Sequence, residues 1–90
     1  MAIHIQYPHS KPHDEARQLA QRVAEEMKKE FSMSYRWEGD VLHFQRSGVD
    51  GKLTVGSDEV VVDAKLGFLL SALQPKIEEE VRRFLRQQFG

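Results

Sequence analysis

The chain opens with two contrasting hydrophobic patterns, which predict a strand followed by a helix. Ile3, Ile5 and Tyr7 alternate with polar residues, and this period of two places the apolar side chains on one face of a strand. From residue 16 to residue 31 the apolar positions recur every three or four residues, as in an amphipathic helix. We expect Ser10 to cap this helix at its N-terminus.

The stretch "SYRWEGDVLHFQ", residues 34–45, predicts a β-hairpin with Gly39 and Asp40 as a two-residue turn. In this register large apolar side chains meet on one face, and the other face is polar and open to water. The facing pairs are Glu38 with Val41, Trp37 with Leu42, Arg36 with His43, and Tyr35 with Phe44. The polar face holds Ser34, Arg36, His43 and Gln45.

A second hairpin is predicted within "KLTVGSDEVVVDAKL", residues 52–66, with Ser57 and Asp58 as its turn. We expect the loop "RSGVDG", Arg46 to Gly51, to join the two hairpins, because its glycines suit turn conformations. It is not a phosphate loop, since it leads into a strand rather than a helix. The facing pairs are Val55 with Val60, Leu53 with Val62, and Lys52 with Asp63. The inner face holds Leu53, Val55, Val60, Val62, Ala64 and Leu66.

Helical spacing returns after Gly67 and continues to the C-terminus. Pro75 interrupts this pattern, and a proline inside a helix removes a backbone hydrogen bond, so we expect a kink or break at residues 71–74. The expected buried stripe is Leu70, Leu73, Ile77, Val81 and Phe84.

The order strand, helix, four strands, helix (β-α-β-β-β-β-α) predicts the α+β class. We expect a curved five-stranded antiparallel sheet with both helices packed on its concave apolar face, a minimal arrangement of the helix-grip type. The length of 90 residues predicts a single domain, residues 1–90.

Composition narrows the classes of partner and chemistry. Lys and Arg total 13 against 14 Asp and Glu, a balance that argues against general electrostatic attraction to nucleic acid or to anionic membranes. The absence of cysteine excludes disulfides and thiolate sites. No apolar run approaches the roughly 20 residues of a transmembrane helix, and the N-terminus does not resemble a signal peptide. We therefore expect a cytoplasmic protein.

The ionisable residues do not form a pattern typical of catalysis. His4, His9 and His13 have no further ligand at a fixed spacing, which argues against a metal site. Asp14 and Glu15 are typical of solvated charges at a helix start, and no serine lies in a nucleophile motif. We expect no catalytic residue, no metal, no cofactor and no enzymatic activity.

Trp37 and Phe44 are the aromatic residues with two competing interpretations. The first is that they fill the core between the sheet and the C-terminal helix, because their neighbours on that face are also apolar. The second is that they line a pocket for an apolar ligand beneath that helix, although a 90-residue interior is expected to be filled by side chains.

Two surfaces are candidates for binding. One is the polar sheet face with Arg36, His43 and Gln45. The other is the C-terminal end, where Leu85 and Phe89 lie off the expected stripe among arginines and could form a small apolar and basic patch. This patch would serve attachment to a partner or self-association into a homo-oligomer.

The run "YRWEGDVLHFQRSGVDGKLTVGSDEVVVDAKLGFLLSALQPKIEEEVRRFL", with "HIQYPHSKPHDEAR" upstream, resembles the polyhydroxyalkanoic acid system family, small bacterial proteins that accompany polyester-granule genes. The segments that carry the resemblance are Trp37 to Asp40, Phe44 to Gly51, Leu66 to Leu70, and Ile77 with Glu78, whereas Pro75 departs from it. The resemblance implies association with granules or granule genes. The function we expect is that of a non-enzymatic accessory or regulatory protein of polyhydroxyalkanoate metabolism that binds a granule protein or the granule surface. The alternative function is a small binder of an apolar or acyl ligand in a minimal helix-grip fold.

Overall fold

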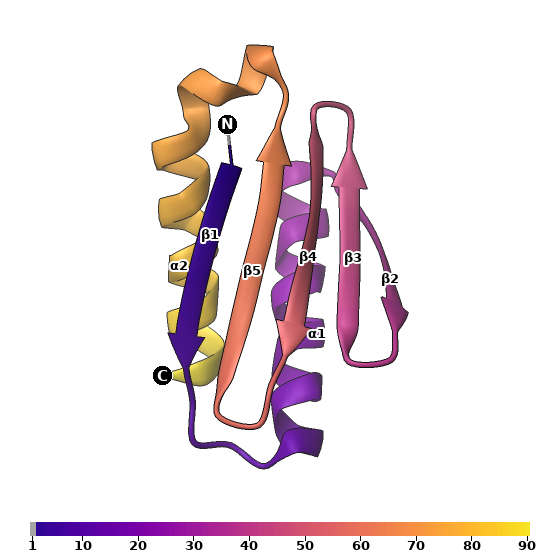
Figure 1. The fold of residues 1–90 in the computed structure, drawn as a ribbon, viewed down its shortest axis with the longest axis vertical. Coiled ribbons are helices and arrows are strands. Elements are labelled where there is room, and N and C mark those ends of the chain that lie inside the picture. Colours follow the sequence, from indigo (N-terminus) through magenta and orange to yellow (C-terminus); the bar gives the residue numbers. More distant parts are fainter. Residues whose placement is uncertain (1) are drawn as a thin grey trace.

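The computed structural model describes residues 2–90 and shows five strands and two long helices (Figure 1). The strands form one antiparallel sheet in the order β1-β5-β4-β3-β2. The elements are β1 (Ala2–Pro8), α1 (His13–Phe31), β2 (Ser34–Glu38), β3 (Val41–Arg46), β4 (Val49–Val55), β5 (Glu59–Leu66), the short 3-10 helix η1 (Phe68–Leu73) and α2 (Gln74–Phe89). The predicted α+β class and element order are confirmed.

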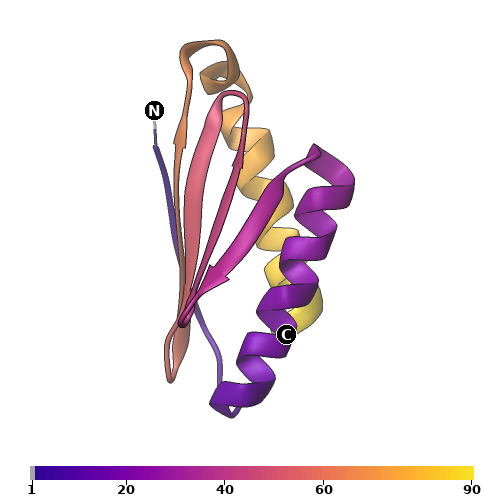
Figure 2. The same ribbon diagram turned by 90° about the vertical axis from the view of Figure 1, so that its right-hand side faces the viewer.

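Both helices cover the same face of the sheet, and the opposite face is open (Figure 2). Helix α1 carries the chain from β1 at one edge of the sheet to β2 at the other, and it packs against α2 along the way. The apolar face of every strand and the apolar stripe of each helix therefore share one core. No helix within residues 2–90 has the length and apolar character needed to cross a membrane.

The predicted hairpin registers are confirmed. Trp37 faces Leu42 across β2 and β3, and Leu53 faces Val62 across β4 and β5. The alternation of side chains along each strand then buries all six predicted inner-face residues of the second hairpin. These buried residues are Leu53, Val55, Val60, Val62, Ala64 and Leu66.

The predicted loop from Arg46 to Gly51 is wrong. The turn contains only Ser47 and Gly48, and β4 begins at Val49, which pairs with both Arg46 and Leu66. Gly48 has a φ of 86°, a backbone conformation that favours glycine and permits so tight a turn. The strand extends to Val49 because this side chain is buried in the core.

Helix α1 follows its predicted stripe but not its predicted cap. It begins at His13 after Pro12, without a side-chain hydrogen bond at its N-terminus, so the expectation that Ser10 caps it is wrong. It ends where Ser32 adopts a left-handed conformation, and the Ser32 N–H donates to the Lys28 carbonyl. The short link to β2 follows directly from this turn.

The predicted break before Pro75 is confirmed. The chain forms η1, and α2 then begins at Gln74, which places Pro75 in the first turn, where its missing N–H costs little. The break changes which side chains face the core: Leu73 is half exposed, and the residues that α2 buries are Val81, Phe84, Leu85 and Phe89.

Candidate functional site

Phe44 belongs to the core, as predicted, and it closes the space that a ligand pocket would need. Its side chain is 3% exposed. A Cβ atom placed on Gly51, in the neighbouring strand, would lie 2.6 Å from two carbons of the Phe44 ring. The ring therefore fills the room that glycine leaves beside it.

Trp37 lies at the rim of the core, not inside it. Its ring is partly buried and packs against the core, and its Nε1–H donates a hydrogen bond of 2.7 Å to the Gln21 side-chain oxygen. The Arg17 guanidinium lies 4.6 Å from the ring centroid, within cation–π range. Trp37 thus joins the edge strand β2 to helix α1.

The predicted polar face is the open face of the sheet. Arg36 and His43 face each other across β2 and β3, and Gln45 lies on the same side two residues along β3. Across the neighbouring strands, the row of side chains that begins with Arg36 and His43 continues with Lys52 on β4, Asp63 on β5 and His4 on β1. It mixes both signs of charge, which does not favour either an acidic or a basic partner.

The predicted patch at Leu85 and Phe89 is wrong. Leu85 is 0% exposed and Phe89 is 6% exposed. With Val81 they form a stripe at intervals of four residues, and this stripe faces the core once α2 starts at Gln74. The end of the chain is also held, because the Tyr7 hydroxyl donates to the Gly90 carbonyl and the ring of His9 lies 5.4 Å from that of Phe89.

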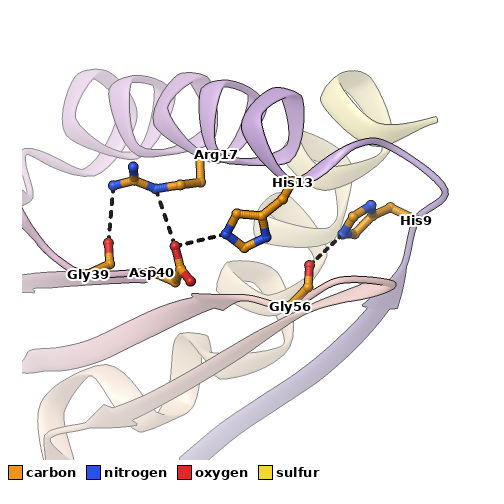
Figure 3. Close-up of polar contacts among 6 residues, drawn as sticks. All are labelled: His9, His13, Arg17, Gly39, Asp40 and Gly56. Atoms are coloured by element: carbon orange, nitrogen blue, oxygen red, sulfur yellow. Dashed lines mark hydrogen bonds and ion pairs between the residues drawn. The ribbon is translucent and has the colours of Figure 1, made fainter.

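The histidines near the start of α1 belong to a polar clasp that ties α1 to two hairpin turns (Figure 3). The His13 ring nitrogen Nε2 lies 2.9 Å from an Asp40 carboxylate oxygen, and Arg17 donates to the Gly39 carbonyl at 3.1 Å. His9 accepts the Lys11 N–H at Nδ1, so its Nε2–H donates to the Gly56 carbonyl. His9 and His13 therefore have separate partners, and residues 2–90 contain no group of three or more histidine, cysteine or acidic side chains that could hold a metal ion.

Phe68 and Leu69 are the apolar residues that the sequence interpretation left without a role. Their side chains are 90% and 86% exposed, and we call these two residues the apolar tip. They lie on η1, which buries none of its residues. The sequence feature that could have identified them is the run "FLL" at residues 68–70, because three consecutive apolar side chains cannot all face one core.

η1 is held against the turn between β3 and β4 at the end of the molecule shown uppermost in Figure 1. The Gly67 N–H donates to the Gly48 carbonyl at 2.8 Å. The Leu70 side chain packs so close to Gly48 that an added Cβ would lie 2.9 Å from it. The apolar tip therefore projects from an anchored turn.

An apolar cleft of about 250 Å³ opens beside the tip. Two cationic side chains, Arg46 and Lys76, also line it. The Arg46 guanidinium is positioned by a hydrogen bond of 2.8 Å to the Phe31 carbonyl. The apolar lining residues are Phe31, Met33, Val49, Leu70, Leu73 and Ile77.

Two of the three acidic residues of α2, Glu78 and Glu80, are paired with arginines that do not line the cleft, whereas Glu79 is exposed and takes part in none of the ion pairs found among residues 2–90. Glu78 lies 3.6 Å from Arg82, and Glu80 accepts two hydrogen bonds from Arg83. The hydrogen bonds from Arg83 lower the pKa of the Glu80 carboxyl group and raise the pKa of Arg83 itself. These pairs leave a locally positive cleft mouth.

Comparison with family models matches residues 3–89 to the family described as "Putative polyhydroxyalkanoic acid system protein". The chain belongs to this family. No curated protein and no solved structure matches the chain. Membership links the chain to polyhydroxyalkanoate metabolism and confirms the resemblance found in the sequence.

Within this polyhydroxyalkanoic acid system fold, most of the segments that carried the sequence resemblance lie near the apolar tip. The segment Phe44 to Gly51 forms the β3–β4 turn with its flanks, Leu66 to Leu70 leads into η1, and Ile77 lines the cleft. Trp37 to Asp40 lies at the other end, and its last two residues, Gly39 and Asp40, belong to the clasp that Figure 3 shows. The tip and its cleft are therefore the candidate functional site.

Proposed function

We propose that this chain is a non-enzymatic accessory protein of polyhydroxyalkanoate metabolism that attaches to the polyester granule surface through the apolar tip. The observation that carries the proposal is the exposure of Phe68 and Leu69, at 90% and 86%. Neither residue contributes to the core, so burial against a partner is the interaction left to them.

The size of the tip supports reversible attachment. Burying one large apolar side chain contributes about 1.5–3 kcal/mol, so Phe68 and Leu69 together contribute roughly 3–6 kcal/mol. That range corresponds to dissociation constants from about 0.04 mM to about 6 mM. Further contacts from Leu73 and the cleft mouth would strengthen this attachment.

The charge distribution supports an orientation with the tip toward the granule. Arg46 and Lys76 lie next to the tip, where they would meet ester carbonyl oxygens or terminal carboxylates of the polyester. At the opposite end of the sheet, the turn between β4 and β5 and the first residue of β5 carry the acidic residues Asp58 and Glu59, whereas Asp40 in the other turn is paired with Arg17. This end would face away from a surface rich in acceptor oxygens.

The experiment compares the double variant Phe68→Ser/Leu69→Ser with the parent in co-sedimentation with granules isolated from cells and with protein-free polyester particles. We expect the variant to leave at least about tenfold more protein in the supernatant with both. The matched control is Val41→Ser/Val61→Ser, which removes two apolar side chains from the open face of the sheet. Equal sedimentation of the tip variant and the parent would overturn the proposal.

The two kinds of particle distinguish the surface from a granule protein. Tip-dependent binding to isolated granules, with no binding to bare particles, would replace the polyester with a granule-bound protein as the partner. The alternative of an acyl ligand held in the core behind Trp37 and Phe44 has less support, because the Phe44 ring occupies the space beside Gly51.

A further inference from the structure

The cleft beside the tip has the composition of a site for an amphiphile with one anionic end. Its apolar lining comes from four elements or their links: the end of α1, the start of β4, η1 and the start of α2. A dry apolar cavity of about 150 Å³ can hold a benzene-sized group. By proportion, the volume of about 250 Å³ suits roughly ten non-hydrogen atoms.

The two cations at the cleft mouth favour a ligand whose polar end is negatively charged. Arg46 uses one guanidinium nitrogen for the Phe31 carbonyl, and its other N–H groups can donate elsewhere. None of the ion pairs found among residues 2–90 involves Arg46 or Lys76. Lys76 is close enough to Glu80 to help lower the pKa of that carboxyl group, but it forms no direct ion pair with it. Arg46 and Lys76 at the mouth of an apolar cleft are therefore complementary to a carboxylate on an aliphatic chain.

The start of α2 adds to this positive potential. Lys76 lies in its first turn, which contains no acidic residue, so the partial positive charge of the helix N-terminus is not offset there. Of the three acidic residues that follow, Glu78 and Glu80 are paired with Arg82 and Arg83, and Glu79 is exposed to solvent, which screens its charge. A carboxylate at the cleft mouth would therefore meet an attractive field.

We infer that this cleft binds the end of an aliphatic carboxylic acid of about eight carbons, with the chain against Leu70 and Ile77 and the carboxylate at Arg46 and Lys76. Such a ligand could be a free alkanoic acid or the carboxyl terminus of a hydroxyalkanoate chain, which present the same chemistry. The inference goes beyond attachment, because Phe68 and Leu69 do not line the cleft.

The test is titration of the ¹⁵N-labelled protein with octanoate, followed by amide chemical shifts. We expect saturable shifts centred on Leu70, Leu73 and Ile77. Lys76→Glu should weaken octanoate binding about fivefold or more, as expected for reversal of an exposed charge. Lys65→Glu is the matched control, because Lys65 is exposed near the same end but does not line the cleft, and it should change the affinity less than about twofold.

A second probe, 1-octanol, separates the two parts of the site. It should bind more weakly than octanoate and should be insensitive to Lys76→Glu. Absence of saturable octanoate shifts, or equal octanoate affinity in the parent and Lys76→Glu, would overturn the inference. A third probe distinguishes a polymer end from a free acid: a poly(3-hydroxyoctanoate) oligomer with a free carboxyl end, compared with its methyl ester. If the polymer end is a ligand, only the oligomer with the free carboxyl end should compete with octanoate. Absence of competition by either oligomer assigns the cleft to free alkanoic acids.

The same titration on Phe68→Ser/Leu69→Ser keeps this inference distinct from granule attachment. We expect that variant to bind octanoate as the parent does, since neither residue lines the cleft. Loss of granule binding with retained octanoate binding supports both assignments. Retained granule binding with retained octanoate binding overturns the attachment role of the tip and leaves the cleft assignment standing.

Discussion

Gly51→Ala is a direct test of how the sheet and its core fit together. Gly51 pairs with Phe44 on one side and Ala64 on the other. A new Cβ would lie 2.6 Å from two carbons of the Phe44 ring and 2.7 Å from the Asp63 carbonyl oxygen. All three distances are shorter than any ordinary contact, so neighbouring atoms must move.

The neighbouring atoms have little room to move. Phe44 is 3% exposed, so its ring cannot swing into solvent, and the Asp63 carbonyl belongs to the backbone of β5. Inserting a methyl group into a packed site costs about 1–3 kcal/mol, and the lower chain entropy of unfolded alanine offsets about 0.4–1 kcal/mol of this. We expect a net loss of about 1.3 kcal/mol, which lowers the melting temperature of a domain of this size by roughly 5–10 °C.

The assay is thermal unfolding followed by far-ultraviolet circular dichroism, with Gly67→Ala as the matched control. A Cβ on Gly67 would meet nothing closer than 3.5 Å, and its φ of −67° suits alanine, so its melting temperature should be unchanged or slightly higher. Phe44→Leu added to Gly51→Ala should cost less than the sum of the single changes, because it removes the ring from the clash. A Gly51→Ala melting temperature within about 2 °C of the parent would refute this account of the packing.

The remaining predictions concern the rim, the open face and one ion pair. Trp37→Ala should lower the free energy of unfolding by about 2–3 kcal/mol in urea, toward the low end of large aromatic truncations because the ring lies at the rim; a loss below about 1 kcal/mol would contradict the packing described. Arg36→Ala with His43→Ala should cost less than about 1 kcal/mol in the same assay, since both lie on the open face, and an unfolded double variant would contradict it. Arg83 lowers the pKa of Glu80 in the folded state below the unfolded value of 4.5. Their hydrogen bonds therefore stabilise the fold at pH values above 4.5, and this stabilisation is lost as the pH falls through the lower pKa of the folded state. The melting-temperature gap between the parent and Glu80→Gln should therefore be present at neutral pH and close in acid as Glu80 becomes protonated in the folded state, whereas a gap independent of pH would contradict the role of the carboxylate.

Strand pairing could be predicted from the sequence because its determinants are local. A two-residue turn at Gly39 and Asp40 sets the register of the first hairpin, and the alternation of side chains then decides which residues face inward. The same reasoning correctly paired Leu53 with Val62. It failed for the link from Arg46 to Gly51, where turn-forming residues hid a strand that begins at Val49.

The candidate site could not be predicted from the sequence, because the rotation of the C-terminal helix about its own axis is not encoded locally. Two stripes are compatible with helical spacing, one through Leu73 and one through Leu85. Pro75 ends the pattern of η1 and allows α2 to begin with a new orientation.

By itself, the sequence determined the class of fold, the order of its elements and the registers of its hairpins, since period, turn chemistry and proline act over a few residues. Only the tertiary structure decided that α2 turns Leu85 and Phe89 into the core and that η1 leaves Phe68 and Leu69 in solvent. The physical reason is that burial depends on packing against β1 and α1, far away in the sequence. The cleft arises in the same way, because Phe31, Arg46, Leu70 and Lys76 come from four separate segments that meet only after folding.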